Sequence, residues 1–472
     1  MKFNATFAAL LFAVCCLLQA AAQDSSASYR VIALDRLDAF QEPGKNWQIA
    51  GTALADYSRR EDMHSLPGSG VIVNTFPKNG RSHLMTKQHF GDLEIELEFM
   101  MANQSNSGVY LQGRYEVQLL DSWRRTQPTF SDAGGIYERW LPEKGNFEGT
   151  APLMNAARAP GLWQQLRIRF RAPRFNAQGE KIRNARFEEV YLNGVLVQQQ
   201  VEVTGPTGSA MFPDEQPEGP LVFQGDHGPV AFRSIRWRPL ALEAPPGSAG
   251  GYQPKPILVD PAARPYLLRT FMHFGDEKLT HVLSVGNPNQ VHYSYNIKQG
   301  ALFQVWRGRF LDLTPAWRDR GGMQTGVPRG SLLALSNAPA VAVLARGTES
   351  WPEAVDFDSL QSHGYVLDTH RNPEFSYTWK GLQVKDKVEC LESGEGLSRT
   401  LTLIDPPAGV YCRLASGKLI EKLKNGMYAV DGQKYYIRLE GRYKPLIRPA
   451  GEGQELLIPF AGNQPVSYSI IW

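Results

Sequence analysis

The chain has 472 residues, and its 50 basic and 47 acidic residues leave a formal net charge of +3. A balance this close to neutral gives no electrostatic footprint for nucleic acid, so we expect no nucleic-acid partner. The 44 Gly, 32 Pro and 11% aromatic residues are typical of turn-rich β structure, and the length exceeds what one core usually supports. We therefore expect a mainly β protein of two domains.

The N-terminus has the layout of a cleavable secretory signal peptide over residues 1–22. Lys2 precedes an apolar run from Phe7 to Leu18, and Ala20 to Ala22 supply small residues before Gln23. The run is too short to span a bilayer comfortably, and no later segment has the length a membrane helix needs. This pattern predicts a periplasmic or secreted protein that leaves the membrane after cleavage. An uncleaved anchor and a buried first strand are alternatives, and so is a lipoprotein, because Cys15 and Cys16 lie in the apolar run. No small residue such as Gly or Ala immediately precedes either cysteine, which favours soluble export.

Residues 43–240 contain a series of short strands that predict antiparallel sheets. In residues 92–99 apolar side chains alternate strictly with acidic ones, which places the two kinds on opposite faces of a strand. The pair Asn193-Gly194 marks a tight hairpin, and the turn Gly225 to Gly228 joins a final pair of strands. Many short strands at this spacing are typical of a β-sandwich or jelly roll.

Residues 241–256 are dense in Pro and Gly and lack a periodic apolar pattern, so they predict a linker. Residues 257–472 again alternate apolar and polar residues at strand length, and Asp431-Gly432 is a hairpin signal. We expect a second β-sandwich domain there. Its two cysteines, Cys390 and Cys412, either form one disulfide or are two small buried side chains.

The second domain also has an aromatic-rich stretch that includes Trp306, Arg307, Phe310 and Trp317. Aromatic and Arg side chains of this kind bind glycans, but they are found more often as the core and rim of a sheet. The sequence favours the core and rim without excluding a glycan site.

Six motifs of the first domain resemble a known family when taken in order: LMTKQHFGDLEIELEF (84–99), NSGVYLQGRYEVQLLDS (106–122), GGIY (134–137), NAARAPGLWQQLRI (155–168), YLNGVLV (191–197) and GPLVFQGDHGPVAFRSIRWRPL (219–240). Together they resemble the 3-keto-disaccharide hydrolase domain family over residues 45 to 240. The resemblance implies a concanavalin-like jelly-roll β-sandwich. It also implies substrates that are glycosides already oxidised to a ketone at the third carbon of the sugar.

Such a ketone acidifies the neighbouring C2 proton, so a base can start an elimination that expels the substituent at C1. Water can then add back, and the net result is hydrolysis or a lyase product. The chemistry needs a base, a group that stabilises the developing oxyanion, and an acid or metal near the leaving oxygen. No glycine-rich nucleotide loop is present, so the resemblance implies a separate sugar 3-dehydrogenase that acts upstream.

The strand at residues 115–121 supplies two candidate catalytic carboxylates, Glu116 and Asp121. The segment EVQLLD resembles a degraded E-x-D-x-x-E signature of laminarinase-like retaining glycosidases, with Gln118 in place of the middle Asp. On a regular strand Glu116 and Gln118 share a face and Asp121 points the other way, so only a β-bulge would let both carboxylates cooperate. Ordinary retaining hydrolysis is therefore the weaker interpretation. A salt-bridged Glu116 without a catalytic role is another.

Two further side chains are candidate catalytic groups. His227 lies in a glycine-flanked turn, where its ring is accessible and suits a base or metal ligand, with Asp226 to orient it. Lys87 precedes the acidic strand and can stabilise an enolate oxygen. The alternatives are a His bonded to a backbone carbonyl and a solvated Lys.

Aromatic, amide and guanidinium side chains give the candidate substrate-binding residues, because sugars are recognised by stacking and by planar hydrogen-bond groups. They are Arg114, Gln118, Trp123, Tyr137, Arg139 and Asn155. For Asn155 an amide that satisfies the backbone of a tight turn is the more common role.

Two classes of function follow for the first domain. The first is an enzyme that cleaves 3-keto-glycosides, with a divalent metal ion as a cofactor that the sequence neither requires nor excludes. The second is a non-catalytic, lectin-like carbohydrate-binding protein, because this fold serves both roles. An enzyme should gather titratable groups at one place, whereas a lectin should show aromatic platforms and amides.

Overall fold

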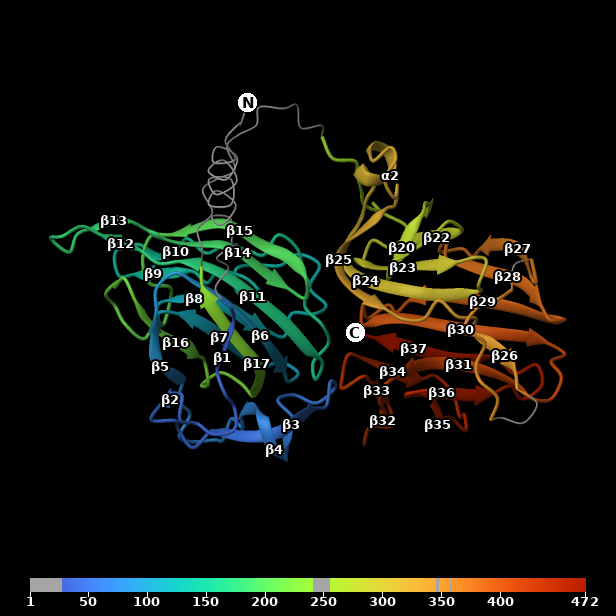
Figure 1. Cartoon of the computed structure of the whole chain (residues 1–472), viewed down its shortest axis with the longest axis horizontal. Helices are drawn as coiled ribbons and strands as arrows, with labels where there is room; N and C mark the ends of the chain where they lie inside the picture. Colours follow the sequence, from blue (N-terminus) through green and yellow to red (C-terminus); the bar gives the residue numbers. More distant parts are fainter. Residues whose placement is uncertain (1–27, 241–254, 345–347, 357) are drawn as a thin grey trace, which may run out of the picture.

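The computed structural model describes residues 28–240, 255–344, 348–356 and 358–472. Within these ranges the chain is built from strands, and the one helix is the short α2 (Thr314–Arg318). No helix in the described part is long and apolar enough to cross a membrane. The predicted signal peptide lies outside the described residues, as does all but the end of the predicted linker. Figure 1 shows two bodies of strands side by side, residues 28–240 on the left and 255–472 on the right.

The first domain consists of two antiparallel sheets and two short hairpins. The large sheet contains, in spatial order, β15 (Val195–Val203), β14 (Ala185–Leu192), β11 (Trp163–Arg171), β6 (Leu93–Met101), β17 (Val230–Pro239), β4 (Met63–Asn74) and β3 (Trp47–Ala55), with β1 (Arg30–Val31) paired to β17. The small sheet contains β2 (Phe40–Gln41), β5 (Leu84–Phe90), β16 (Gly219–Phe223), β7 (Asn106–Leu111) and β8 (Tyr115–Leu120). The hairpins are β9 (Arg139–Leu141) with β10 (Gly145–Phe147), and β12 (Arg174–Phe175) with β13 (Lys181–Arg183).

The core of the first domain lies between the two sheets, and strand alternation sets which side chains enter it. On β6 the apolar residues are buried, while the acidic residues bind arginines of β17, as Glu96 does with Arg236. On β8 the side chains of Tyr115, Val117 and Leu119 belong to the core. Because side chains alternate along a strand, the residues between them face outward, away from the large sheet. The outer face of the small sheet is therefore where the polar residues of β8 gather.

The predicted hairpin at Asn193-Gly194 is confirmed, since both residues adopt the positive φ angles that a tight turn between β14 and β15 requires. The final pair of strands differs from the prediction. The turn Gly225 to Gly228 joins β16 of the small sheet to β17 of the large sheet, so these two strands do not pair with each other. The turn instead crosses the edge of the sandwich, which brings its side chains beside the outer face of the small sheet.

The second domain is also built from packed antiparallel sheets, as predicted. Its six-stranded sheet contains β18 (Leu258–Val259), β24 (Ala301–Asp312), β23 (Val291–Asn296), β22 (Val282–Gly286) and β19 (Tyr266–Arg269), with β25 (Val327–Ala334) paired to β24. The eight-stranded sheet contains β27 (Leu360–Leu367), β28 (Pro373–Trp379), β29 (Leu382–Cys390), β30 (Gly396–Ile404), β37 (Val466–Ile471), β34 (Tyr435–Leu439), β33 (Tyr428–Val430) and β32 (Ile420–Lys422). A four-stranded sheet of β26 (Val341–Val343), β31 (Val410–Gly417), β36 (Gly453–Pro459) and β35 (Leu446–Ala450) and a hairpin of β20 (Met272–Phe274) and β21 (Glu277–Leu279) complete it.

The predicted hairpin at Asp431-Gly432 joins β33 to β34. Both cysteines of the second domain are free thiols rather than a disulfide. Burial raises the pKa of Cys390 and of Cys412 to about 12. They are therefore unreactive, small apolar side chains at neutral pH.

The two domains contact each other through buried side chains as well as backbone groups. The guanidinium of Arg307 lies 5.5 Å from the ring centroid of Trp123 and 5.7 Å from that of Trp472. The backbone N–H of Trp163 donates to the carbonyl of Gln433 at 3.2 Å. Because Trp123 follows β8 closely in the chain, these contacts attach the second domain to the loop beside the outer face of the small sheet.

Candidate functional site

Glu116 is a carboxyl group buried on the outer face of the small sheet. It is 2% exposed, and burial raises its pKa from the ordinary 4.5 to about 8. Its direct partner on the neighbouring strand is Tyr110, whose hydroxyl hydrogen-bonds to the carboxyl, and the charge of Asp226 raises the pKa further. At neutral pH most of the Glu116 side chains therefore carry a proton and can donate it.

Gly108 makes room for this carboxyl group. An added Cβ at that position would lie 2.0 Å from Oε1 of Glu116, so any larger residue would displace the acid. Gln118 lies directly opposite Gly108 on β8. With its amide turned so that the nitrogen faces acceptors, Gln118 donates to Oε1 of Glu116 at 3.1 Å and to the carbonyl of Ser107 at 3.0 Å. The acid is thus held by one hydroxyl and one amide.

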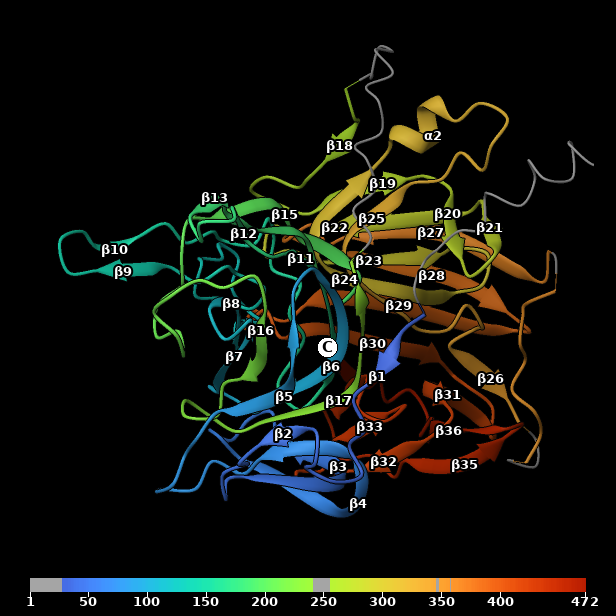
Figure 2. The same ribbon diagram turned by 60° about the vertical axis from the view of Figure 1, so that its left-hand side comes forward.

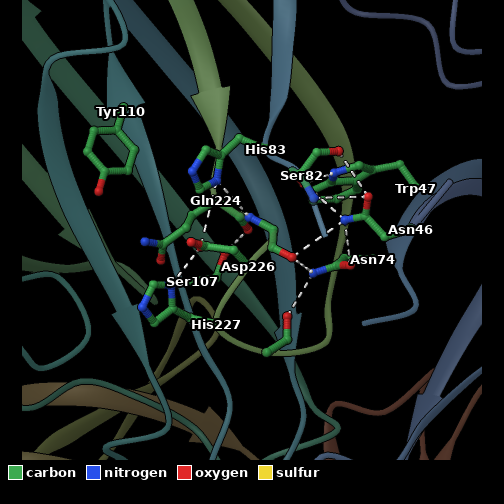
Figure 3. Close-up of polar contacts among 12 residues, drawn as sticks. Asn46, Trp47, Asn74, Ser82, His83, Ser107, Tyr110, Gln224, Asp226 and His227 are labelled. Carbon is green, nitrogen blue, oxygen red and sulfur yellow. Dashed lines mark hydrogen bonds and ion pairs between the residues drawn. The ribbon is translucent and has the colours of Figure 1, made fainter. Parts of the chain in front are cut away.

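Asp226 lies between two histidines, as Figure 3 shows. Its Oδ1 is 2.6 Å from Nδ1 of His227 and 3.8 Å from Nδ1 of His83. His227 is exposed at the rim of the sandwich, and His83 is partly buried just before β5. The predicted accessible ring of His227 and its contact with Asp226 are therefore present. Because the Asp226 charge also raises the pKa of Glu116 and of Tyr110, the acid and the histidine pair belong to one electrostatic cluster.

Hydrogen bonds determine which nitrogen of each histidine carries the proton. The backbone N–H of Gly225 donates to Nδ1 of His83 at 3.2 Å, so this nitrogen is unprotonated and Nε2 carries the hydrogen. Burial lowers the pKa of His83, which keeps the ring neutral. In neutral His227 the Nδ1–H donates to the Asp226 carboxylate, which leaves Nε2 with a free lone pair. His83 therefore presents a donor and His227 presents a base.

Two buried asparagines hold this arrangement in place. The Asn74 amide nitrogen donates to the carbonyls of Gly225 and Gly228, at 3.0 and 2.8 Å, and so spans the turn that carries His227. The Asn46 amide donates to Oδ1 of Asn74 and accepts from the backbone N–H of Ser82, the residue before His83. One pair of side chains thus fixes the backbone on both sides of Asp226 (Figure 3).

The structure does not place Asp121 with Glu116. The pairing of β7 with β8 runs without a bulge from Asn106–Leu120 to Leu111–Tyr115, so the two carboxyl groups keep opposite orientations. Asp121 instead accepts a hydrogen bond from the backbone N–H of Gln104 at 2.8 Å. The prediction of a catalytic pair of carboxylates is therefore corrected, because the bulge on which it depended is absent.

Lys87 also lies apart from the cluster. It is exposed on β5, and strands β16 and β7 separate β5 from β8. Neighbouring strands are about 4.8 Å apart, so three steps across the sheet exceed the reach of a lysine side chain. The predicted gathering of Lys87 with Glu116 is corrected on this ground.

Four of the predicted substrate-binding side chains have other partners. Arg114 is buried and paired with Asp214 at 2.8 Å, and Trp123 packs on Arg307 of the second domain. Arg139 binds Pro206, Thr204 and Glu148. Asn155 donates to the carbonyls of Ser122 and Arg125 and accepts from the N–H of Ala157, which satisfies its amide completely. These side chains support loops, whereas Gln118 and Tyr137 remain beside Glu116.

Three residues of the cluster were not predicted from the sequence as site residues: His83, Tyr110 and Gln224. Gln224 is 6% exposed, and its amide oxygen is buried without a hydrogen-bond partner in the described part of the chain. Tyr110 carries a weak signal, because it is paired in register with Glu116 once the hairpin of β7 and β8 is assumed. His83 carries none, since 142 residues separate it from the Gly225 N–H that it accepts.

Metal-binding side chains do not gather at one point in the described ranges. Among these residues no group of three His, Cys, Asp or Glu side chains is arranged to hold a metal ion. The cluster around Asp226 contains a protonated carboxyl group, two imidazoles and a carboxylate.

Residues 28–240 therefore form a jelly-roll β-sandwich with a polar cluster on the outer face of its small sheet. Residues 40–238 match the family described as the 3-keto-alpha-glucoside-1,2-lyase-like domain. This match confirms the resemblance drawn from the six motifs. The match ends before the second domain.

Comparisons with other proteins add limited information. No curated protein sequence matches the chain. Among solved structures, two proteins of Parabacteroides distasonis ATCC 8503, both provisionally assigned as glycosyl hydrolases, are 27% and 19% identical to the chain. They cover 42% and 41% of it and 79% and 99% of their own chains, with TM-scores of 0.30 and 0.26. The carbohydrate-binding module CBM66 from Bacillus subtilis is 10% identical and covers 41% of this chain and 94% of its own, with a TM-score of 0.22. At these TM-scores the similarities carry no inference about substrate or reaction.

Proposed function

We propose that the first domain cleaves 3-keto-glycosides by an elimination across C1 and C2 that a base initiates. The observation that carries the proposal is the arrangement around Asp226. His227 presents a free Nε2 lone pair on one side, and the buried Glu116, with a pKa of about 8, carries a transferable proton on the other. Glu116 serves as the acid and Nε2 of His227 as the base of this elimination.

In the first step Nε2 of His227 takes the proton from C2 of the sugar. The electron pair of the C2–H bond forms a C2–C3 double bond, and the ketone oxygen at C3 becomes an enolate oxygen. Asp226 stabilises the imidazolium that forms, because its carboxylate accepts from Nδ1–H at 2.6 Å. The Nε2–H of His83 is the donor for the enolate oxygen, a role in which a neutral imidazole is effective.

In the second step the enolate collapses, the C3 ketone re-forms and a C1–C2 double bond appears. The C1–O bond to the leaving group breaks, and Glu116 gives its proton to the departing oxygen. Solvent then restores the proton on Glu116 and removes the one on His227. If water adds across C1–C2 before release, the net reaction is hydrolysis; if it does not, the product is that of a lyase.

The lectin-like alternative is less well supported by the same cluster. Binding alone does not require a carboxyl group whose pKa lies near 8 or a histidine oriented by a carboxylate. Ordinary retaining hydrolysis loses support as well, because it needs two carboxyl groups about 5–5.5 Å apart that flank the scissile bond, and Asp121 points away from Glu116. Export and an upstream sugar 3-dehydrogenase remain predictions from the sequence.

The proposal is tested by incubating the full chain with 3-keto-trehalose and with an aryl 3-keto-glucoside, while the release of glucose or the phenol is measured. The matching unoxidised glycosides serve as controls and should not react. Performed in heavy water, the reaction should incorporate deuterium at C2 if the product is hydrated. No turnover of either 3-keto substrate would overturn the proposal, and equal turnover of the unoxidised sugars would replace it with ordinary hydrolysis. A chelator arm tests for a metal ion.

A further inference from the structure

The second domain has a hollow beside α2 and β19. It measures about 680 Å³, within the usual range for small-molecule sites. Its lining includes three aromatic side chains, Tyr266, Phe271 and Trp317, and three polar ones, Arg269, His281 and Gln324. Figure 2 shows α2 at the top of the second domain, beyond β19. The hollow is formed by residues of the second domain alone, so it is separate from the cluster around Asp226.

The aromatic side chains of this hollow are unusually exposed. Trp317 is 69% exposed, Tyr266 46% and Phe271 39%. None of the residues of α2 is buried, and Ala316 is the residue of this helix that packs against the core cluster beside it. By contrast, Trp306 and Phe310 of the same aromatic-rich stretch are completely buried. The stretch therefore divides into a core part and an exposed part. A packing role in the core does not explain why a tryptophan stands at position 317.

The polar side chains of the hollow have hydrogen-bonding groups without a partner among the described residues. Among the described residues, neither the Arg269 guanidinium nor the Gln324 amide has a hydrogen-bond or ion-pair partner. His281 uses Nδ1 for a contact with the Thr280 hydroxyl at 2.9 Å, which leaves Nε2 available. Burial, together with the nearby positive charges of Lys298 and Arg269, lowers the pKa of His281. No acidic residue lines the hollow.

A second hollow of similar size differs in that its charged side chains have partners within the protein. It measures about 610 Å³, lies on the large sheet and has Glu96, Arg167 and Arg236 in its lining. There Arg236 is paired with Glu96, and Arg167 lies 4.2 Å from the ring centroid of Tyr191. Its arginines are thus already engaged by a carboxylate and by an aromatic ring of the protein.

We propose that the hollow beside α2 is a binding site for an oligosaccharide of pyranose sugars. A pyranose has two kinds of surface, a face of C–H groups that packs on aromatic rings and an edge of hydroxyls that bonds to planar donors and acceptors. Trp317, Tyr266 and Phe271 supply the first surface, and Arg269, His281 and Gln324 supply the second. The site takes a glycan chain rather than the reacting sugar, because it contains no carboxyl group to act as an acid.

The test is isothermal titration of the full chain with maltohexaose, cellohexaose, laminarihexaose and an oligogalacturonate. We expect at least one of them to bind, and Trp317→Ala to weaken that binding tenfold or more. The matched control is Trp140→Ala, since Trp140 is also exposed, at 59%, but lies on β9 of the first domain. It should leave the affinity unchanged. A second variant, Gln324→Ala, should weaken binding without removing an aromatic ring.

Two variants distinguish glycan binding at this hollow from the proposed reaction of the first domain. Trp317→Ala should leave the turnover of a small aryl 3-keto-glucoside unchanged, whereas His227→Asn should leave glycan binding unchanged. The proposal is wrong if none of the four oligosaccharides binds, or if binding is the same in Trp317→Ala as in the unaltered chain. Failure of the reaction with 3-keto substrates has no bearing on either outcome.

Discussion

Oδ1 of Asp226 lies 2.6 Å from Nδ1 of His227, and this contact fixes the direction in which His227 can act. In the neutral ring the hydrogen bond holds the proton on Nδ1, so the lone pair is on Nε2. The same carboxylate is 3.8 Å from His83, whose Nδ1 instead accepts from a backbone N–H. The Asp226 carboxylate thus makes His227 a base, and the Gly225 N–H makes His83 a donor.

His227→Asn should lower kcat for an aryl 3-keto-glucoside by about 10²- to 10⁴-fold, since the variant retains a polar side chain but has no base. The control is His64→Asn. His64 is also exposed and lies 2.8 Å from a carboxylate, that of Asp62, but is on β4 of the large sheet. It should leave kcat unchanged. Equal losses in both variants would indicate general damage rather than the loss of a base.

Asp226→Asn should lower kcat by a comparable factor while retaining the shape of the turn. An amide can donate to Nδ1 of His227, which would favour the tautomer with its proton on Nε2 and so block the base. Removal of the charge should also lower the pKa of Glu116, because Asp226 raises it. The pH at which activity falls on the alkaline side should therefore shift downward. A pH–rate profile measures this shift, and an unchanged alkaline limb would contradict the link between Asp226 and Glu116.

Glu116 should make the protein less stable as the pH rises. Its pKa is about 8 in the folded protein and 4.5 in the unfolded chain. Because the folded value is the higher one, the favourable contribution is complete below about pH 4.5 and is lost progressively up to about pH 8. The loss is on the order of 3–5 kcal/mol in the free energy of unfolding. Glu116→Gln stays neutral at every pH, so in urea titrations it should be more stable than the unaltered chain at pH 8.5 and similar to it at pH 4. Parallel pH dependences of the two proteins would contradict the raised pKa.

Gly108→Ala should abolish most activity while leaving the fold largely intact. The new methyl group would lie 2.0 Å from Oε1 of Glu116, so the carboxyl group must leave its place beside Tyr110. Gly91→Ala is the matched control, because the added Cβ there would meet its nearest neighbour at an ordinary 3.4 Å. Circular dichroism should show a folded protein for both variants, whereas kcat should fall only in Gly108→Ala. Full activity in Gly108→Ala would show that the position of Glu116 does not matter for the reaction.

The sequence predicted more of the fold than of the site. The strands follow from patterns of neighbouring residues, whereas the site depends on contacts between residues far apart in the chain. Alternation within a single strand placed the outward side of β8 correctly, including Glu116 and Gln118, because this pattern is local. The odd spacing of Glu116 and Asp121 along the strand also showed that a role for Asp121 required a β-bulge. The pairing of β7 with β8 contains no such bulge.

The misplaced residues depend on contacts between distant parts of the chain. His83 meets the turn of His227 only because β16 and β17 belong to different sheets, which the hairpin interpretation of that turn did not anticipate. Trp123 was predicted to contact the sugar, but Arg307 of the second domain lies 5.5 Å from its ring. Its aromatic character was visible in the sequence, while its partner was not. Strand order and domain packing therefore set the limit of the prediction.

Asn74→Ala should reduce both activity and stability, because the Asn74 amide spans the turn by donating to the carbonyls of Gly225 and Gly228. Loss of two buried hydrogen bonds costs about 1–3 kcal/mol per carbonyl left unsatisfied. Asn155→Ala is the control, since Asn155 is equally buried and likewise donates to two backbone carbonyls, those of Ser122 and Arg125. Both variants should lose similar stability in urea titrations. Only Asn74→Ala should lower kcat well below that of the control at a temperature where both are folded, because only it releases the turn that positions Asp226 and His227. If both variants lost kcat equally, the effect would come from stability alone, and Asn74 would have no part in placing the base.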